Sequence, residues 1–508
     1  MDLSWIQRPG FPGHFFALAL GALLPFSFAP YGYWILQFPV VALLYFSLQN
    51  LGSKTALWRG WWFGLGAYAA GVSWVYVSIH IHSHTPQVPA FIITLAFVAG
   101  LAWFFALLTF CFNRFFVGKS VPFLSFAALW VGFEWIRSWF LSGFPWLYLG
   151  DAHIDTWLAG FAPVFGVYGI SFLVVLISTY SFTLFKQRNW KPALVWLSPW
   201  LIGLILSTIP WTSPIKTSNV VAIQGNIPQH RKWLSEEIYP TLEKYRSATE
   251  QNWDADLILW PETAITVLQH QAKEYLAFLN DAGQENQTAI LTGIPYQQQA
   301  NEAHPGAYHN SIMGLGLANG IYHKQKLVPF GEYMPLPDSW RPLLGFFNIP
   351  MSQFRPGSAQ QKPLSMATQE ADYSIAPFIC YEVVYPDFAA QLAKDSGLMV
   401  TISNDAWFGH SIGPKQHLGI AKMRALENGR YLLRATNTGI TALIDHKGRI
   451  VEQLPQFEYG VLKAQAQIME GNTPFTLMGS WPMRIIILLI LAGIVWREYQ
   501  KPKIPPAM

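Results

Sequence analysis

The chain has 508 residues, which is enough for two or more domains. Hydrophobic residues make up 52% and charged residues only 12%, whereas soluble proteins carry about 25% charged residues, so we expect a membrane protein. The net charge of +4 is too small to favour nucleic acid as a partner. Cys111 lies in an apolar run and Cys380 in a polar region, so we expect no disulfide between them.

The charged residues are unevenly distributed, with only 13 of them in residues 1–210. Seven apolar stretches of the kind that cross a bilayer lie in this half, and an eighth lies near the C-terminus. The predicted spans are Phe15–Phe28, Tyr33–Leu48, Trp61–Ile79, Ala90–Phe112, Val121–Leu141, Val164–Phe185, Ala193–Ile209 and Trp481–Trp496. A cleaved signal peptide is the alternative for the first stretch, but we find no small-residue cleavage site followed by soluble sequence.

We therefore predict a polytopic α-helical membrane domain of about eight spans, with seven in residues 1–210. Residues 211–474 would form a water-facing domain, and residues 475–508 a last transmembrane helix with a tail. With a cytoplasmic N-terminus, the inside loops and the tail hold Lys54, Arg59, Arg114, Lys119, Lys186, Arg188, Lys191, Arg497, Lys501 and Lys503. The outside loops contain no Lys or Arg, so the positive-inside rule places residues 211–474 outside the cytoplasm.

Two polar clusters in the first half have competing interpretations. His80, His82 and His84 alternate as metal ligands on a strand would, but no carboxylate or cysteine accompanies them, so we expect an outside loop without metal. Glu134 and Arg137 are one helical turn apart in a predicted span, where charges are costly. We expect a structural pair there rather than a catalytic role.

From residue 218 onward, strand-like and helix-like segments alternate. The predicted strands are Asn219–Asn226, Asp256–Trp260, Ala289–Ile294, Ser311–Leu317, Gly320–Val328, Ser374–Cys380, Leu398–Ser403, Leu432–Asp445 and Gly460–Gln467. The predicted helices are Leu234–Asp254, Phe388–Lys394 and Pro414–Arg430, and residues 446–448 mark a late hairpin turn. This alternation indicates a layered α/β domain.

Three short segments carry the candidate chemistry. Glu262 follows one predicted strand, Cys380 stands at the end of another, and Lys324 lies between them in the sequence. Alone, such a Glu is commonly a solvated loop residue and such a Cys a buried small hydrophobe. Together they fit acyl transfer, because a thiol needs a base to become a nucleophile and a lysine can stabilise the negative charge that develops on the acyl oxygen. An unpaired thiol outside the cytoplasm is also exposed to oxidation, which suggests that Cys380 is used.

These segments resemble the catalytic motifs of the nitrilase superfamily. The matching residues are Trp-Pro-Glu ending at Glu262, Tyr-x-Lys-x-x-Leu-x-Pro-Phe-Gly-Glu from Tyr322 to Glu332, and Ile-Cys-Tyr-Glu from Ile379 to Glu382. A domain of this kind between seven membrane spans and one resembles the apolipoprotein N-acyltransferase family of Gram-negative bacteria over essentially the whole chain. The resemblance includes Ser403–Gly409 and Gly143–Trp146 and implies an α/β nitrilase-like (αββα sandwich) extracytoplasmic domain.

The resemblance also implies roles for individual residues. Glu262 would be the general base, Lys324 the oxyanion-stabilising residue and Cys380 the nucleophile. Glu332, Tyr381 and Glu382 would support this site, and Trp233, Trp407, Phe408 and Trp146 are candidate lid or substrate-contact residues. Lys326 would point to the same face as Lys324 if the segment is a strand, and would then add positive charge.

The implied reaction passes an acyl chain from a phospholipid to Cys380 as a thioester. The α-amine of the S-diacylglyceryl cysteine of an apolipoprotein then accepts the chain. The implied location is the inner membrane, with the catalytic domain in the periplasm. No nucleotide loop or metal-ligand cluster predicts a cofactor. The apolar segment Pro342–Pro350 is a candidate lid that dips into lipid, and a core loop is the alternative.

Two other functions compete with this one. A membrane-anchored nitrilase-type amidase or hydrolase of a C–N substrate would use the same three residues with water as acceptor, but a single anchoring helix would suffice for it. A transporter would need ionisable residues inside several spans, whereas Glu134 and Arg137 are nearly alone.

Overall fold

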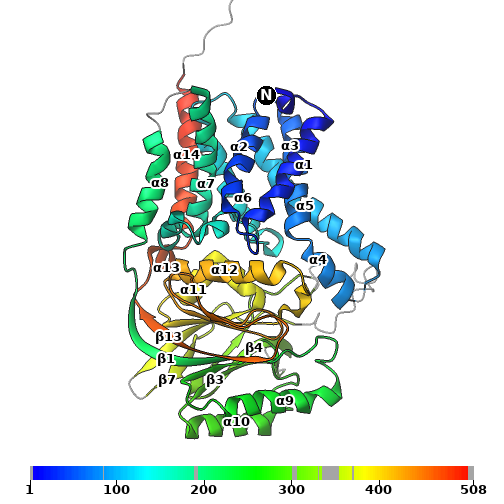
Figure 1. Cartoon of the computed structure of the whole chain (residues 1–508), viewed down its shortest axis with the longest axis vertical. Coiled ribbons are helices and arrows are strands. Elements are labelled where there is room, and N and C mark those ends of the chain that lie inside the picture. Colours follow the sequence, from blue (N-terminus) through cyan, green and yellow to red (C-terminus); the bar gives the residue numbers. More distant parts are fainter. Residues whose placement is uncertain are drawn as a thin grey trace, which may run out of the picture. The chain divides into compact units, whose positions relative to one another are not determined.

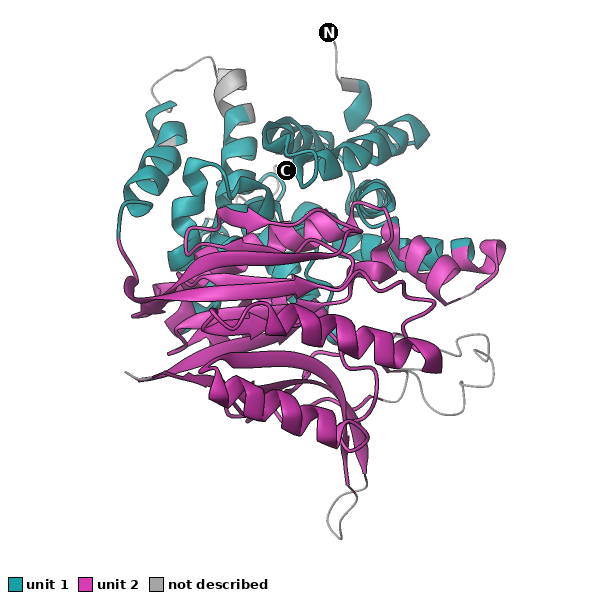
Figure 2. Cartoon of the chain, turned by 60° about the horizontal axis from the view of Figure 1, so that its bottom comes forward, with its two compact units in different colours: residues 1–73, 91–209, 478–508 teal, residues 74–90, 210–477 magenta. Residues whose placement is uncertain are grey.

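The computed structural model describes residues 4–83, 85–187, 193–299, 306–329, 331–333, 354–368 and 371–501. The chain forms two compact units (Figure 2). Unit 1 comprises residues 1–73, 91–209 and 478–508, and unit 2 comprises residues 74–90 and 210–477. Residues 74–90 belong to the same unit as the three candidate segments, although residues 74–79 are the end of the predicted span Trp61–Ile79.

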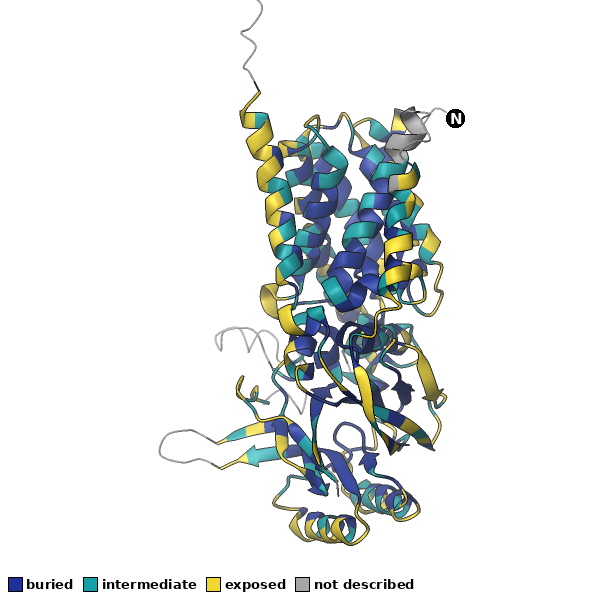
Figure 3. Cartoon of the chain, turned by 90° about the vertical axis from the view of Figure 1, so that its left-hand side faces the viewer, coloured by how far each residue is buried: buried dark blue, intermediate teal, exposed yellow. Residues whose placement is uncertain are grey.

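Unit 1 is built of helices. Its main helices are α1 (Phe11–Leu23), α2 (Gln37–Ser47), α3 (Ser53–Gly71), α5 (Gln87–Phe115), α6 (Pro122–Arg137), α7 (Ala162–Gln187), α8 (Ala193–Leu206) and α14 (Trp481–Tyr499). Large apolar side chains on α5 and α14 are exposed, among them Phe91, Ile92, Leu488 and Leu489, and Figure 3 shows such exposed stretches along the helices. Exposed apolar side chains on helices are what a lipid environment favours.

Each predicted apolar stretch contains a helix, but the number of membrane spans stays a prediction. By length and composition, two helical segments of the described residues can cross a membrane, Gln87–Phe115 and Trp157–Ser181. A third qualifies if Ser53–Gly71 and Trp74–His82 are counted as one bent span. The apolar helices Phe11–Ser27, Trp34–Ser47 and Trp196–Leu206 are shorter.

Over the predicted span Trp61–Ile79 the structure has two helical segments with a break between them, which qualify as a membrane span when they are counted together. Helix α3 ends at Gly71, and the chain bends by 55° into α4 (Trp74–Val77) and the π-helical turn η4 (Ser78–His82). In unit 2 this bent segment packs against η10 (Asp405–Phe408): the Trp74 and Phe408 rings meet edge to face at 4.7 Å, and Ser78 Oγ donates to the Trp407 carbonyl at 2.8 Å.

Unit 2 contains two sheets. The first has the order β13-β1-β2-β3-β4-β6, and the second the order β12-β11-β10-β9-β8-β7-β5. The strands are β1 (Ser213–Gln224), β2 (Leu257–Leu259), β3 (Ala289–Gln298), β4 (Ala307–Gly316), β5 (Ala318–Asn319), β6 (Ile321–His323), β7 (Leu364–Ala367), β8 (Asp372–Ile379), β9 (Leu398–Ser403), β10 (Leu432–Thr436), β11 (Ala442–Ile444), β12 (Ile450–Gln453) and β13 (Gly460–Glu470). Strands β1, β2 and β3 run parallel, as do β8, β9 and β10, so three strand ends meet at one edge of each sheet.

Helices cover the outer face of each sheet (Figure 1). Helices α9 (Ser235–Glu250) and α10 (Lys273–Glu285) share a core with the first sheet through Tyr245 and Leu279, and α11 (Pro386–Ala393) and α12 (Gly413–Asn428) contact the second. Between the sheets, a second core joins residues of both, such as Leu259, Ile379 and Val400. Strands buried on both faces are continuously apolar, as the sequence of β9 shows. The predicted α/β fold with an αββα arrangement is thereby confirmed.

Two predicted strands have other bounds in the structure than the sequence indicated. The predicted strand Gly320–Val328 stops at His323 because Lys324 and Gln325 leave the sheet to make contacts at its edge. The predicted strand Leu432–Asp445 is two antiparallel strands, β10 and β11, joined by a turn. The hairpin turn at residues 446–448 is confirmed, since it joins β11 to β12 and Gly448 has a φ of 75°.

Candidate active site

Glu262 lies in the loop after β2. A Cβ on Gly293 of β3 would stand 2.4 Å from the Pro261 carbonyl oxygen and 2.8 Å from the Glu262 Cα, so only glycine lets the loop lie this close to the strand. Thr263 has a left-handed backbone with a φ of 48°. The loop thus holds the Glu262 carboxylate, which is only 7% exposed, at the edge of the first sheet.

Lys324 follows β6 directly, and its side chain is 1% exposed. Its amide donates to the Asn310 carbonyl on β4 at 2.8 Å, and its Nζ donates to Glu332 Oε1 at 2.8 Å and lies 3.8 Å from Glu262 Oε1. Asn310 Nδ2 donates to Glu262 at 2.7 Å and to Glu332 at 3.1 Å. One buried ammonium and one amide therefore hold two buried carboxylates together.

Cys380 begins the 3-10 helix η9 (Cys380–Val384) immediately after β8. Its φ of 53° is uncommon for a residue other than glycine and occurs mainly in turns and functional sites. The Ile379 amide donates to Glu382 Oε2 at 2.8 Å, which closes this turn. The thiol is partly buried, and its Sγ lies 3.3 Å from Ser403 Oγ, within hydrogen-bonding distance.

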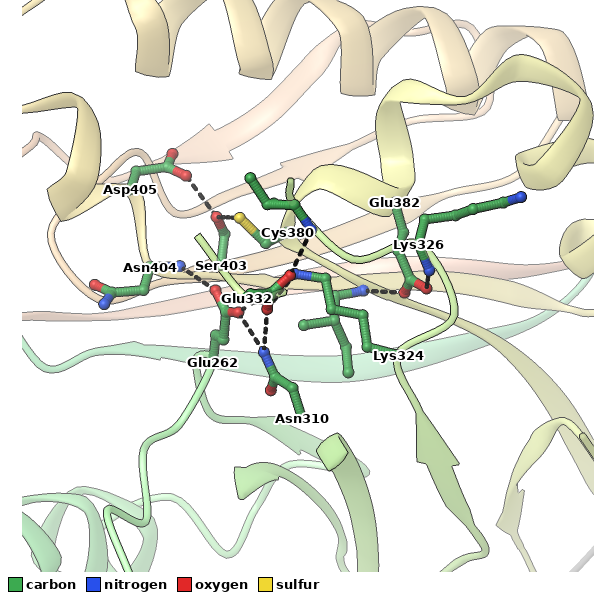
Figure 4. A network of polar contacts seen from close by, with 12 residues as sticks. Glu262, Asn310, Lys324, Lys326, Glu332, Cys380, Glu382, Ser403, Asn404 and Asp405 are labelled. Atoms are coloured by element: carbon green, nitrogen blue, oxygen red, sulfur yellow. Dashed lines mark hydrogen bonds and ion pairs between the residues drawn. The ribbon is translucent and has the colours of Figure 1, made fainter. Parts of the chain in front are cut away.

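The end of β9 connects the thiol to the carboxylate (Figure 4). Ser403 contacts Cys380 Sγ, and the amide of the next residue, Asn404, donates to Glu262 Oε2 at 2.8 Å. Because consecutive residues touch Cys380 and Glu262, the two groups lie at one place between the sheets. The structure thus brings together Glu262, Lys324 and Cys380, which are far apart in the sequence.

The charges at this place are strongly coupled. Burial raises the pKa of Glu262 above its ordinary value, and the Lys324 ammonium opposes this rise. Burial alone lowers the pKa of Lys324, but the carboxylates of Glu332 and Glu262 raise it overall, so the ammonium stays charged. Burial and the Glu262 carboxylate raise the pKa of the Cys380 thiol, while Lys324 lowers it. The resting thiol is therefore protonated, and forming the thiolate requires a group that takes its proton.

Glu382 connects the Lys324 loop to the Cys380 turn. Its Oε1 accepts hydrogen bonds from the Tyr322 hydroxyl at 2.9 Å and from the amides of Gln325 and Lys326 at 2.6 and 3.0 Å. Together with the Ile379 amide, these donors occupy both oxygens of a fully buried carboxylate. Glu382 therefore fixes the relative position of two loops, whereas neighbouring Tyr381 packs edge to face on Tyr385.

Lys326 does not add charge to the site, contrary to the expectation for a continued strand. Because β6 ends at His323, the alternation of faces is lost, and the Lys326 side chain points away from Lys324 in Figure 4. Its Nζ lies 5.7 Å from the ring centroid of Tyr385 and 5.6 Å from that of Phe388. The cation therefore stacks on aromatic rings outside the site.

A second buried lysine does face Glu262, and no pattern in the sequence indicated it. Lys232 is 2% exposed, its Nζ donates to the Glu262 carbonyl oxygen at 2.9 Å, and burial lowers its pKa to about 8. The adjacent Trp233 is 41% exposed. This loop is tied to the site by Asn404 Nδ2, which donates to Gln229 Oε1 at 2.7 Å.

The other candidate residues contact aromatic side chains. Trp407 and Phe408 lie in η10, where Phe408 is 9% exposed and Trp407 contacts the His82 ring at 5.5 Å. Trp146 belongs to unit 1, is buried and stacks on Phe144. The candidate lid Pro342–Pro350 lies outside the described residues.

The structure also describes the two polar clusters in the first half of the chain. His80 and His82 lie in a π-helical turn rather than on a strand, and His84 is outside the described residues. Across the described ranges, no three His, Cys, Asp or Glu side chains are grouped to hold a metal ion. Glu134 Oε1 accepts hydrogen bonds from Trp130 and the Leu149 amide, and Arg137 lies over the Tyr68 and Tyr148 rings, so both charges make structural contacts within unit 1.

Asn310, Ser403 and Lys232 were missed as site residues. Asn310 and Ser403 have a weak signal in the sequence, because each is a polar residue within or at the end of a strongly apolar strand. Lys232 has none, since an isolated lysine in a polar loop is normally exposed. These residues belong to the site because each contacts a residue that is far away in the sequence.

Known proteins resemble both halves of the chain. The family described as carbon-nitrogen hydrolase matches residues 219–470, and the apolipoprotein N-acyltransferase N-terminal domain matches residues 20–180. The crystal structure of Saccharomyces cerevisiae Nit3, a member of branch 10 of the nitrilase superfamily, aligns with a TM-score of 0.37 at 14% identity, over 58% of this chain and 98% of that chain.

Two relatives match along nearly their whole length. The apolipoprotein N-acyltransferase of Pseudomonas aeruginosa (strain LESB58) is 46% identical over 98% of this chain and 99% of that protein. The one of Photobacterium profundum is 42% identical over 92% of this chain and 91% of that protein. With this identity over the full length, and with both domains matched in order, the chain belongs to the apolipoprotein N-acyltransferase family and is an acyltransferase.

Proposed function

We propose that the protein transfers an acyl chain from a phospholipid to the α-amine of a diacylated apolipoprotein through a thioester on Cys380. The observation that carries the proposal is the convergence of Glu262, Lys324 and Cys380, bridged by consecutive residues at the end of β9. Family membership supports the lipoprotein acceptor. The phospholipid donor and the residue roles are part of the proposal.

In the first half-reaction, Glu262 takes the thiol proton as Cys380 Sγ attacks the carbonyl carbon of a phospholipid ester. The negative charge that develops on the carbonyl oxygen is stabilised by the Lys324 ammonium. The intermediate collapses by breaking the ester C–O bond, and Glu262 returns the proton to the leaving oxygen. The products are a lysophospholipid and an acyl-thioester on Cys380.

In the second half-reaction, the lipoprotein α-amine attacks the thioester carbon. Glu262 accepts a proton from the amine, Lys324 again stabilises the oxyanion, and the C–S bond breaks. The thiolate leaves and regains its proton, so that the site returns to its resting state. An amide bond has then formed on the lipoprotein. The buried position of Glu262 and Lys324 supports a site from which water is excluded, and this exclusion protects the thioester from hydrolysis.

The proposal includes a location. Both substrates are lipids of the membrane, so we infer that unit 1 is embedded in the inner membrane by about eight spans and that the catalytic domain faces the periplasm. The apolar helices of unit 1, the absence of Lys and Arg from the predicted outside loops and the Gram-negative relatives support this location.

The test is intact-mass measurement of the purified protein. Incubation with phospholipid alone should raise the mass by one acyl chain, and a diacylated lipopeptide with a free amine should then remove that mass and become N-acylated. A lipopeptide with a blocked amine should leave the adduct in place. Steady release of free fatty acid without peptide acylation would instead support the hydrolase alternative.

Two cysteine variants make matched controls. Cys380→Ala should fold, form no adduct and transfer nothing, whereas Cys111→Ala in α5 should behave like the wild type because its thiol lies in a helix of the other compact unit. Acyl transfer that persists in Cys380→Ala would remove the basis of the proposed mechanism.

A further inference from the structure

A buried polar cluster lies beside Cys380, on the second sheet and the helix that covers it. Its members are Ser403, Asp405, His417 and Arg434, each 2% exposed or less. Arg434 Nη2 donates to Asp405 Oδ2 at 2.6 Å, and His417 Nδ1 lies 3.2 Å from Asp405 Oδ1. The proposed acyl transfer assigns no role to this cluster, although it touches the nucleophile twice.

The first contact is to sulfur. Ser403 Oγ is within hydrogen-bonding distance of both Cys380 Sγ and Asp405 Oδ1. A hydroxyl has one proton, so it cannot donate fully to both. A carboxylate is a much stronger acceptor than a neutral thiol, and the proton therefore points to Asp405 while Cys380 is protonated.

The second contact is to the backbone. His417 Nε2 lies 3.2 Å from the Cys380 carbonyl oxygen, and burial lowers the pKa of His417, so the ring is neutral. The tautomer with its proton on Nε2 donates to that carbonyl and accepts from Arg434 Nη2 through Nδ1 at 3.1 Å. The contact is made to the residue whose backbone is left-handed.

We propose that Ser403 is a positioning residue that turns its hydroxyl proton from Asp405 to Cys380 Sγ when the thiolate forms, and so stabilises the nucleophile. The inference rests on the proposed role of Cys380. When Glu262 takes the thiol proton, the charged sulfur becomes a competitive acceptor. Asp405 can release the hydroxyl because Arg434 still neutralises it. Ser403 then supplies a hydrogen bond that is strongest when the nucleophile is charged.

The charged groups that face Cys380 determine whether each variant should raise or lower the pKa of its thiol. Lys324 favours the thiolate, while Glu262 from the first sheet and Asp405 from the second disfavour it. Removing the Ser403 hydroxyl takes away a donor and should raise the apparent pKa of the thiol. Asp405→Asn removes a negative charge and weakens the competing acceptor, so it should lower that pKa. If the cluster had only a structural role, loss of the Ser403 hydroxyl and Asp405→Asn would not shift the pKa of the Cys380 thiol in opposite directions.

The test is the pH dependence of Cys380 alkylation by iodoacetamide in the full-length protein, in a Cys111→Ala background. At neutral pH, Ser403→Ala should react about 10- to 100-fold more slowly, as expected for the loss of one hydrogen bond to a charged group. Ser403→Thr keeps the hydroxyl and should recover most of the lost rate. Asp405→Asn should react faster than the parent.

Thr401→Val is the matched control, since Thr401 lies on β9 two residues earlier, is fully buried and makes no hydrogen bond through its hydroxyl within the described part of the chain. Its alkylation profile should equal that of the parent. An unchanged profile in folded Ser403→Ala, or slower alkylation in folded Asp405→Asn, would overturn the inference. Alkylation reports the thiol itself, whereas failure of the proposed function would appear as acyl transfer by Cys380→Ala.

Discussion

Three non-glycine residues with a left-handed backbone come shortly after strands of unit 2. Asn226 follows β1, Thr263 follows β2 and Cys380 follows β8, with φ values of 49°, 48° and 53°. Each such residue costs of order 1 to 3 kcal/mol and persists only where surrounding contacts enforce it. At Cys380 those contacts are known: Glu382 closes the turn and His417 binds the carbonyl. The site is therefore held in shape before any substrate binds.

Removing either charged partner of the thiol should impair transfer strongly. Glu262→Gln and Lys324→Met should each lower the rate of N-acylation by about 100- to 1000-fold, the usual effect of deleting one group that stabilises a transition state. Lys326→Met is the matched control and should have a small effect, because its cation lies over Tyr385 and Phe388. Lipopeptide N-acylation by the purified variants measures this, and a larger loss in Lys326→Met would reassign the lysine.

We predict that Lys232 affects the pKa of Glu262, the proposed general base. Its ammonium lowers the pKa of Glu262, whereas burial raises it. Glu262 must be ionised to accept a proton, so the rate of thioester formation falls as pH drops through its pKa. In Lys232→Met that pKa should rise, and the acidic limb of the pH–rate profile should move to higher pH. Rates of adduct formation by intact mass across the acidic to neutral pH range test this shift, and an unmoved acidic limb would contradict it.

At the scale of elements, β3 sets the position of the Glu262 loop. Gly293 leaves no room for a Cβ, since the backbone of Pro261, Glu262 and Thr263 lies against it. None of these contacts is with a flexible side chain, so a larger residue must push the loop away from the strand. The Ile265 amide, which donates to the Gly293 carbonyl, would be displaced together with the loop.

Gly293→Ala should therefore impair both stability and activity. We expect a loss of about 1 to 3 kcal/mol in the free energy of unfolding, as for other overpacked sites, and a reduced rate of thioester formation because Glu262 moves. Thermal unfolding and intact mass measure the two effects. Gly100→Ala in α5 is the control, because a Cβ there meets no atom within 4 Å. Wild-type values in Gly293→Ala would show that the loop position is not set by this contact.

At the scale of the whole molecule, the membrane topology can be tested directly. In a background without Cys111 and Cys380, we would place one cysteine at the exposed Tyr239 of α9 and, in a second variant, one at the exposed Tyr499 of α14. A membrane-impermeant maleimide should label Tyr239→Cys in intact spheroplasts and Tyr499→Cys only after permeabilisation. The reverse pattern would contradict the predicted orientation.

The sequence by itself determined the family and the succession of layers in the α/β domain. Apolar stretches marked the helices, buried strands were recognisable by their continuous apolar residues, and three motifs led to the prediction that Glu262, Lys324 and Cys380 carry the chemistry. These features depend on neighbours in the chain, since helix and strand patterns and motif spacing are local properties.

The tertiary structure alone decided which polar residues surround Glu262, Lys324 and Cys380. Ser403, Asn310 and Lys232 join the site through contacts between strands and loops that are far apart in the sequence, and Lys326 leaves it because β6 ends early. The contact of Trp74 with Phe408 of η10 is likewise not visible in the apolar pattern of the sequence. The physical reason is that a polar residue has the same local sequence signature whether it is solvated or buried, and only long-range packing determines which partner replaces water.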